Sequence, residues 1–384
     1  MTIKVLICDL IGLKFDKNGK PDVSEMRAYI ESKGCAFHFG VQPIIDDDKI
    51  HFFYEPDISI EAEILALADQ GQFDALIAAA TFIPKTSRFR LGGVRIGAGT
   101  GNMGSASWGG GNGVGGDAPL MNTPGFNSRA TAQMTLKALL RVRPDLPIQE
   151  LHDRSVAGDF DTGKDLRFYP TEKLEGKTMA IIGFGNIGRE VAKLAAAFGM
   201  IVKVYARPAH RERIEAEGFT YAVTAEAAAQ NADVLSVHTG LGALDATTKQ
   251  FANAGLINSK ILNVMNPGAM VLNYDRGECV DVNALDAALS SGQIACAAID
   301  ADIFKSADGT LFGPLVPYLP LAKKYPNRVE LLPHAAADTD HPSRVAGAKQ
   351  AVDQIIDCIL NKRVTNLKGD LPKGYVNAGV KLGV

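Results

Sequence analysis

Three glycines in the middle of the chain have the spacing that a phosphate-binding turn needs. Gly183, Gly185 and Gly188 form the pattern G-x-G-x-x-G directly after the β-prone run 178–182. Gly183 would allow a tight turn, Gly185 would let the backbone approach a pyrophosphate, and Gly188 would let the next helix pack on the strand. Free N–H groups and the dipole at a helix start favour an anion. The pattern predicts a dinucleotide site, with a phosphate-free structural turn as the alternative.

The residues after the first two glycines extend this pattern. Asn186 and Ile187 open an amphipathic helical run, so both belong to the expected cofactor site. The β-prone run Ile201–Tyr205 then completes a βαβ unit. An NAD-binding unit usually has Asp or Glu at the end of this second strand, where the carboxylate accepts hydrogen bonds from the ribose 2′-OH. Here the strand is followed by Ala206 and Arg207, so the expected carboxylate is missing.

Arg207 changes the cofactor that we expect. A missing carboxylate removes repulsion against a 2′-phosphate, and a guanidinium can bind that phosphate through two hydrogen bonds. We therefore favour NADP, with NAD as the alternative. In the competing interpretation, Arg207 and Arg211 belong to a solvated basic loop that Glu212 and Glu215 balance.

Polar side chains stand at the ends of four further β-prone runs. These residues are His238, Asn273, Asp300 and His334. Ligands of parallel α/β sheets bind outside the carboxyl ends of the strands. We therefore expect the four side chains to converge around one crevice, and we count His238 and Asp300 among the cofactor-binding residues.

Strand-like and helix-like runs alternate along the chain, which predicts an α/β fold with parallel sheets. A length of 384 residues is long for one domain, so we expect two. Ser128–Val142 and Arg344–Leu360 predict long helices, and the polar stretch Gly158–Tyr169 predicts a connector. The segment 96–116 is dense in glycine, which resists helix formation. It is either a flexible linker or a loop that lines a ligand cleft.

The composition excludes several classes of function. The formal net charge is −3 and no Lys/Arg tract is visible, which argues against nucleic acid and anionic membranes as partners. The N-terminus lacks a signal-peptide pattern, and no apolar run approaches the roughly 18 residues that span a bilayer. The five cysteines are scattered without a C-x-x-C pair. This favours reduced thiols in a cytoplasmic protein without a metal site.

Further motifs follow one another in a recognisable order. The stretch Asn273–Asp281 contains Asn-x-x-Arg-Gly with Arg276, and a Leu-Pro-His run ends at His334. Together with the glycine pattern, they resemble the D-isomer-specific 2-hydroxyacid dehydrogenases, which include phosphoglycerate, D-lactate, glycerate and formate dehydrogenases. Gly97–Met103 resembles the substrate loop of that family, and Asn122–Asn127 resembles its interdomain hinge.

The resemblance implies two Rossmann-like or flavodoxin-like domains with parallel sheets, the nucleotide-binding domain being inserted in the substrate domain. Residues 1–127 and 340–384 would form the substrate domain, and 128–339 the dinucleotide-binding domain. Homodimers are usual in the family. The implied function is an oxidoreductase that transfers a hydride between a nicotinamide cofactor and a small D-2-hydroxy acid or 2-oxo acid.

The resemblance also implies roles for single residues. Arg276 would bind the carboxylate and carbonyl oxygen of the substrate. His334 would be the general acid in reduction and the general base in oxidation. Backbone N–H groups of Ala98 and Gly99 would hold the substrate carboxylate, and Asp300 would orient the nicotinamide carboxamide. Taken singly, the Arg also fits a structural salt bridge and the His a side chain satisfied inside a turn.

One position departs from the family pattern. The family places a Glu five residues after the Asp that Asp300 matches, where it pairs with the catalytic His, and this chain has Lys305 there. Asp302 and Asp308 are nearby carboxylates that can substitute, and we favour Asp302 as the third catalytic residue. Alternatively, His334 has no acidic partner, as in formate dehydrogenase.

Two other function classes remain open at this point. A non-catalytic, dinucleotide-sensing protein of the same fold fits the missing Glu but leaves the intact Arg276 and His334 unexplained. Another enzyme with an inserted Rossmann domain, such as an amino-acid dehydrogenase or a homocysteine hydrolase, would lack the Asn-x-x-Arg-Gly and Pro-His motifs.

Overall fold

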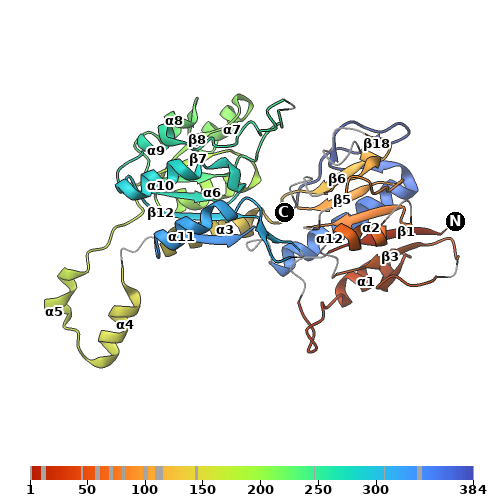
Figure 1. Ribbon diagram of the computed structural model, residues 1–384, viewed down its shortest axis with the longest axis horizontal. Helices are drawn as coiled ribbons and strands as arrows, with labels where there is room; N and C mark the ends of the chain where they lie inside the picture. Colours follow the sequence, from red (N-terminus) through yellow and green to blue (C-terminus); the bar gives the residue numbers. More distant parts are fainter. Residues whose placement is uncertain are drawn as a thin grey trace. The chain divides into compact units, whose positions relative to one another are not determined.

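The structure is a computed structural model, and it divides the chain into two compact units (Figure 1). The first unit is Met1–Ala130 with Ala337–Val384, and the second is Thr131–Ala336. The domain boundaries that we expected, after residue 127 and before residue 340, lie close to these. The residues that the structure describes are 2–9, 14–44, 46–56, 61–68, 72–79, 81, 83–97, 103–108, 116–142, 146–245, 247–306, 308–334 and 340–383.

The first unit is built on a seven-stranded sheet. In sheet order, its strands are β17 (Leu367–Lys368), β6 (Leu120–Thr123), β5 (Gly93–Ile96), β4 (Ala75–Ala78), β1 (Ile3–Ile7), β3 (Ile50–Tyr54) and β2 (Ala36–Phe39). Within the described residues, these strands pair in parallel except for β17, which runs antiparallel to β6 at one edge. The other named elements of this unit are α1 (Ser24–Ser32), α2 (Glu61–Ala68), η2 (Ala106–Trp108), α12 (His341–Asn361), β16 (Arg363–Val364) and β18 (Val376–Asn377).

The second unit is built on a seven-stranded sheet whose described pairings are all parallel. In sheet order, its strands are β15 (Val329–Pro333), β12 (Ile294–Ala301), β11 (Ala269–Asn273), β10 (Val234–Val237), β7 (Thr178–Ile182), β8 (Ile201–Tyr205) and β9 (Thr220–Ala222). The strand order reverses between β7 and β10. In open parallel sheets, ligands bind at such a reversal, outside the carboxyl ends of the strands.

The remaining named elements follow in chain order: α3 (Ser128–Val142), α4 (Ile148–Ala157), α5 (Thr162–Asp165), η3 (Leu166–Phe168), α6 (Asn186–Ala197), η4 (Pro208–His210), α7 (Arg211–Ala216), α8 (Ala225–Ala229), α9 (Ser259–Asn263), η5 (Gly277–Cys279), α10 (Val282–Ser291), β13 (Phe304–Lys305), β14 (Leu311–Phe312), η6 (Val316–Tyr318) and α11 (Leu319–Lys324). The predicted α/β fold with two largely parallel sheets is confirmed.

The core of the second unit lies on both faces of its sheet. Alternate side chains of a strand point to opposite faces. Ala180 and Ile182 of β7 accordingly join one buried cluster, while Met179 and Ile181 join the other. A strand that is covered on both faces reads as a continuous apolar run, which is why the sequence before the glycines has no polar residue between 179 and 182.

Two segments differ from what the sequence led us to expect. Gly158–Tyr169, expected to be a connector, contains α5 and η3, and Asp161 caps α5 by accepting a hydrogen bond from the backbone N–H of Gly163. In the glycine-rich segment, Trp108 is 1% exposed and stacks on Phe89 with ring centroids 5.9 Å apart. Its indole therefore anchors this part of the segment in the core. Neither of the two expected roles, a flexible linker or a loop lining a cleft, predicts such an anchor.

No helix within the described ranges combines the length and the apolar character that crossing a bilayer requires.

Candidate active site

The glycine turn follows β7, at the point where the strand order reverses. Gly183 has a φ of +103°, and a Cβ atom there would collide with the carbonyl oxygen of His238. A Cβ atom on Gly188 would collide with the carbonyl oxygen of Gly183. Around Gly185, in contrast, no atom lies within 4 Å of an added Cβ. Two glycines therefore permit the close packing of strand and helix, and the third leaves open space in front of the helix.

That open space adjoins the N-terminus of α6. Gly185 is the N-cap residue, and the helix start carries no side-chain cap. The first two helical residues, Asn186 and Ile187, present their N–H groups in the direction of the turn because helical N–H groups point toward the N-terminus. An uncapped helix start with a Cβ-free approach fits the pyrophosphate of a dinucleotide.

A cavity of about 600 Å³ extends from the turn across the carboxyl ends of β8 and β10. Its described lining residues are Gly183, Phe184, Gly185, Tyr205, Ala206, Arg207, Pro208, His210, Tyr221, Val223, His238, Thr239, Gly242 and Asn253. Of the residues predicted to bind the cofactor, Gly183, Gly185, Arg207 and His238 thus line one cavity. The others are not among its described lining residues; they are Asn186, Ile187, Gly188 and Asp300.

At the β8 end of this cavity, Arg207 is the only arginine of its loop among the described lining residues. Arg211 pairs with Glu215 at 2.9 Å, and Arg213 pairs with Glu217 at 3.1 Å. None of the described lining residues is acidic. The basic loop is therefore divided: two arginines are balanced by carboxylates, and the Arg207 guanidinium lies against His210, with Nη2 3.2 Å from Nε2.

His238 lines the same cavity from the end of β10. It is 8% exposed, and its Nε2 atom lies 2.8 Å from the hydroxyl oxygen of Ser236. Burial lowers the pKa of His238 to about 3, so the ring is neutral in ordinary buffers. Its buried Nδ1 atom has no hydrogen-bond partner among the described residues. Buried polar atoms are normally paired, so Nδ1 is suited to a polar group of a bound ligand.

A second cluster lies after β11, β12 and β15. His334 Nδ1 is 2.6 Å from Asp300 Oδ1, and Arg276 Nη1 is 3.4 Å from Asp302 Oδ2. The register of β12 on β15 brings Asp300 opposite Leu332, two residues before His334, and the His334 N–H donates to the Ala301 carbonyl. Parallel pairing of neighbouring strands therefore assembles these charges at one end of the sheet.

The partner of His334 is not the one that we expected. We expected Asp302 or Asp308, but the hydrogen bond is made by Asp300, and Asp302 pairs with Arg276 instead. The carboxylate of Asp308 accepts from Ser306 and Thr310 inside the β13–β14 hairpin. The reason is the length of β12: the strand continues to Ala301 and keeps Asp300 beside β15, and the chain leaves the strand only at Asp302.

Asp300 also sets the protonation of the ring. Burial by itself lowers the pKa of His334, but the hydrogen bond and the negative charge of Asp300 outweigh it. The pKa of His334 therefore lies above its ordinary value. Asp300 is 2% exposed, so little solvent screens the pair.

Arg276 is held by contacts that the sequence did not indicate. The Asn273 side-chain amide donates to the Arg276 carbonyl at 2.8 Å, and Asp275 N–H donates to the Asn273 side-chain oxygen. The carboxylate of Asp275 accepts from the backbone N–H of Gly240, and burial raises the pKa of Asp275. Asn273 thus shapes the turn that carries the Arg. Asp275 was missed because nothing in its spacing predicted this contact.

Comparison with known proteins decides the family. A model described as the NAD binding domain of D-isomer specific 2-hydroxyacid dehydrogenases matches residues 146–336. Glyoxylate reductase of Thermococcus litoralis is 31% identical over 264 residues, which cover 68% of this chain and 70% of that protein. The chain belongs to the D-isomer specific 2-hydroxyacid dehydrogenase family. The resemblance predicted from the motifs is confirmed.

A second relative and a solved structure are also similar to this chain. D-3-phosphoglycerate dehydrogenase of Rattus norvegicus is 31% identical over 248 residues, which cover 65% of this chain and 42% of that protein. The solved structure of NAD⁺-bound 3-phosphoglycerate dehydrogenase of Entamoeba histolytica has a TM-score of 0.64 at 18% identity. The match covers 97% of this chain and all of that one, and at this identity it shows a common fold.

As a member of the 2-hydroxyacid dehydrogenase family, the protein is an oxidoreductase that transfers a hydride between a nicotinamide dinucleotide and a small D-2-hydroxy acid or 2-oxo acid. In the first unit, the Gly97 N–H donates to the Thr123 hydroxyl at 3.1 Å. Ala98 and Gly99, predicted to hold the substrate carboxylate, lie outside the described residues, so their role stays a prediction.

Proposed function

We propose that the protein is an NADP-preferring reductase of a small 2-oxo acid, with His334 as the proton donor and Arg276 as the substrate-binding cation. The observation that carries the proposal is the Asp300–His334 pair, with its 2.6 Å contact and raised His pKa. An imidazolium near neutral pH can give a proton to an oxygen on which negative charge develops.

In this proposal each charged side chain has one task. When bound, the nicotinamide supplies or accepts the hydride. Arg276 offers a planar fork of donors to the carboxylate and carbonyl oxygen of the acid. His334 protonates that oxygen in reduction and accepts the proton in oxidation. Asp300 holds the ring and stabilises its charged form. Asp302 keeps the guanidinium in place, since it is the carboxylate that pairs with Arg276.

Arg207 is the basis for the proposed preference for NADP. It lines the cavity at the end of β8, where an NAD-binding unit usually has an acid, and no acidic residue is among the described lining residues. A 2′-phosphate would find a guanidinium there and no repelling carboxylate.

The test is an assay of the purified protein with a panel of 2-oxo acids, each with NADPH and with NADH. We expect turnover of at least one small 2-oxo acid and a lower KM for NADPH. Binding of a dinucleotide without turnover of any acid would favour a sensing protein. Turnover with a several-fold preference for NADH would leave the proposed dehydrogenase activity standing. It would contradict the proposal that Arg207 selects NADPH.

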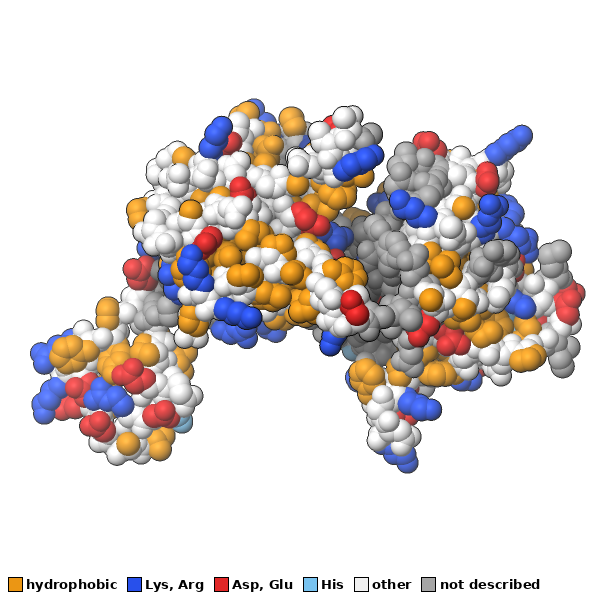
Figure 2. Space-filling model, viewed as in Figure 1, with side chains coloured by type: hydrophobic (Ala, Val, Ile, Leu, Met, Phe, Trp, Pro, Cys, Tyr) orange, Lys and Arg blue, Asp and Glu red, His pale blue; other side chains and the backbone are white. Residues whose placement is uncertain are grey.

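We also propose that the enzyme is a homodimer in the cytoplasm. Free thiols at all five cysteines support a reducing compartment. Support for the dimer comes from the segment 146–172, in which α4, α5 and η3 contain no buried residue. Apolar side chains lie between charged ones on its surface (Figure 2). They are Leu146, Ile148, Val156, Leu166 and Phe168, exposed by 39% to 74%.

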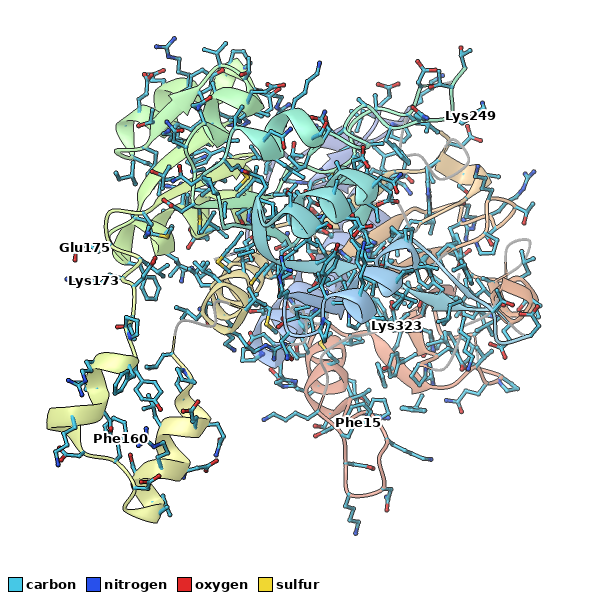
Figure 3. All side chains as sticks on the ribbon, turned by 60° about the vertical axis from the view of Figure 1, so that its left-hand side comes forward. Phe15, Phe160, Lys173, Glu175, Lys249 and Lys323 are labelled. Carbon is cyan, nitrogen blue, oxygen red and sulfur yellow. The ribbon has the colours of Figure 1, made fainter. Side chains whose placement is uncertain are left out.

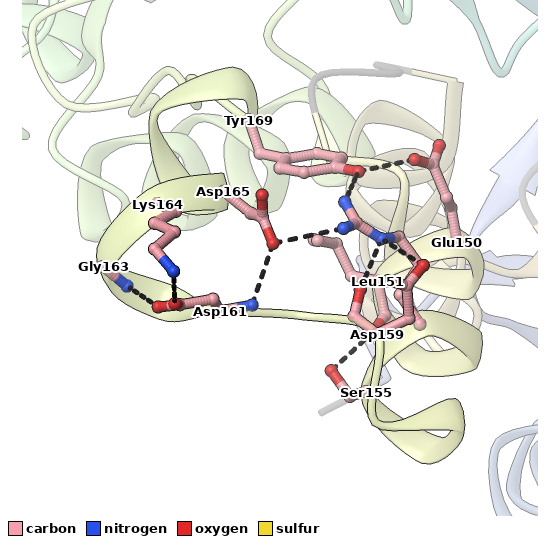
Figure 4. A network of polar contacts seen from close by, with 10 residues as sticks. Glu150, Leu151, Ser155, Asp159, Asp161, Gly163, Lys164, Asp165 and Tyr169 are labelled. Atoms are coloured by element: carbon pink, nitrogen blue, oxygen red, sulfur yellow. Dashed lines mark hydrogen bonds and ion pairs between the residues drawn. The ribbon is translucent and has the colours of Figure 1, made fainter.

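This segment nevertheless has a defined internal structure. Arg154 donates to the Tyr169 hydroxyl at 2.9 Å and to Asp165 at 3.2 Å, and Tyr169 donates to Glu150 at 2.6 Å (Figure 4). Phe160, labelled in Figure 3, belongs to this segment, and its ring centroid lies 5.9 Å from that of Tyr169. A shaped segment whose apolar side chains face solvent fits an interface with a second copy of the chain.

Light scattering after size exclusion tests the dimer. Phe168 is 67% exposed, and Phe168→Asp together with Ile148→Asp should give a folded monomer. Phe15, 70% exposed in the first unit, provides the matched control, because Phe15→Asp should remain dimeric. A wild-type monomer would contradict the proposal.

A further inference from the structure

The contact between Arg207 and His210 points to a second residue in cofactor choice. We propose that His210 is the second ligand of the 2′-phosphate of NADPH and takes up a proton when that cofactor binds. The inference rests on the proposed preference for NADP. Both side chains line the same cavity, next to the end of β8. His210 is half-buried at the end of η4, directly before α7.

The contact with Arg207 indicates which ring nitrogen accepts a hydrogen bond before the cofactor binds. A guanidinium has donors only, so the 3.2 Å contact from Arg207 Nη2 requires a lone pair on His210 Nε2. With Nε2 accepting from Arg207, a neutral ring would hold its proton on Nδ1. In this state the ring accepts a hydrogen bond and carries no charge that would attract a phosphate.

A phosphate monoester at Arg207 would reverse this arrangement. It would engage the donors of the guanidinium that now reach the ring, and it would bring a nearly doubly negative charge beside it. A neighbouring negative charge favours the protonated form of an imidazole. His210 would then hold a proton on Nε2 and donate it to a phosphate oxygen, so that Arg207 and His210 bind the same group.

None of the described residues that line the cavity with His210 is acidic. From its own loop it faces Arg207, and Arg211 follows it directly. Arg211 lies over the Tyr221 ring of β9 at 5.5 Å and is paired with Glu215, so this carboxylate is already engaged. Among the described residues that line the cavity, the other titratable groups are the tyrosines of β8 and β9 and His238. Within this lining, the negative charge that would favour the protonated His210 comes from the ligand.

The consequence is a cofactor preference that depends on pH. A bound 2′-phosphate would make the pKa of His210 higher in the NADPH complex than in the free protein. The added affinity is fully present below the free value and is lost as the pH rises through the value in the complex. NADH has no 2′-phosphate, so its affinity should stay level over the same range.

Isothermal titration calorimetry tests the inference directly. NADPH and NADH are titrated into the enzyme at pH 7.5 in HEPES and in Tris, whose different ionisation enthalpies reveal proton uptake. We expect wild type to take up a substantial fraction of a proton with NADPH and none with NADH. His210→Gln should abolish this uptake and weaken NADPH binding about tenfold at pH 6.5, as for loss of one charge-assisted hydrogen bond. His152→Gln, at an exposed His in α4, should behave like wild type.

The outcomes separate this inference from the proposed cofactor preference. If Arg207→Ala weakens NADPH binding but His210→Gln leaves both the affinity and the proton uptake unchanged, His210 is not a ligand and the preference stands. If NADPH binds no better than NADH and Arg207→Ala changes nothing, the preference fails and the inference fails with it.

Discussion

The glycine turn after β7 and the charged cluster after β11, β12 and β15 both follow the carboxyl ends of strands in one sheet. Their residues act through different physical effects. In the turn, Gly183 and Gly188 allow close packing because an added Cβ would collide with backbone oxygens. In the cluster, function lies in side-chain charges such as the Asp300–His334 pair. The turn is therefore defined by excluded volume and the cluster by electrostatics. Substitutions at Gly183 or Gly188 should alter stability, whereas those in the cluster should alter chemistry within an unchanged fold.

The largest effect is expected in the cluster. His334→Ala removes the proton donor, and Arg276→Lys keeps the charge but loses the planar fork. Each change should lower kcat/KM by about 10³-fold, in the range of lost acid–base or electrostatic catalysis. Steady-state kinetics measure the loss, and thermal unfolding should show little change because both side chains are more than a quarter exposed.

Lys323→Ala at the exposed surface of α11 is the control and should retain normal kinetics. Near-normal turnover by either cluster variant would remove that residue from the mechanism. An unfolded cluster variant would break the distinction between the two regions, because it would show that the cluster also holds the fold.

The turn provides a matched pair of changes with opposite readouts. Gly183→Ala forces a methyl group against a backbone oxygen at a φ of +103°, so we expect a loss of about 2–4 kcal/mol in the free energy of unfolding. Gly185→Ala meets no atom within 4 Å at a φ of −76°. It should keep its unfolding temperature and weaken dinucleotide binding, measured by quenching of fluorescence or by calorimetry. Equal stability of the two variants would contradict this account of the turn.

The same contrast explains what could be predicted from the sequence. The turn, the parallel α/β fold class and the helix Ser128–Val142 were predictable because glycine spacing and apolar periodicity act locally along the chain. The partner of His334 was not, since it depends on how far β12 extends beside β15. Because β12 continues to Ala301, Asp300 stays beside β15 and contacts the ring. The role of His210 was also invisible, because its contact with Arg207 arises only once η4 has formed.

The smallest effect should separate the two carboxylates that the sequence could not rank. Reduction requires the imidazolium of His334, so its rate should stay high below the raised pKa of this residue and fall as the pH rises through it. Asp300→Asn removes the charge and the acceptor that raise this pKa. The descending limb should therefore move by about one unit toward acid. Asp302→Asn should move it in the same direction by only a few tenths of a unit, because this carboxylate acts on the ring through charge alone. Profiles of kcat/KM against pH for both variants decide between them, with exposed Asp308→Asn as the control. A larger shift for Asp302→Asn than for Asp300→Asn would return the partner role to Asp302, as the sequence suggested.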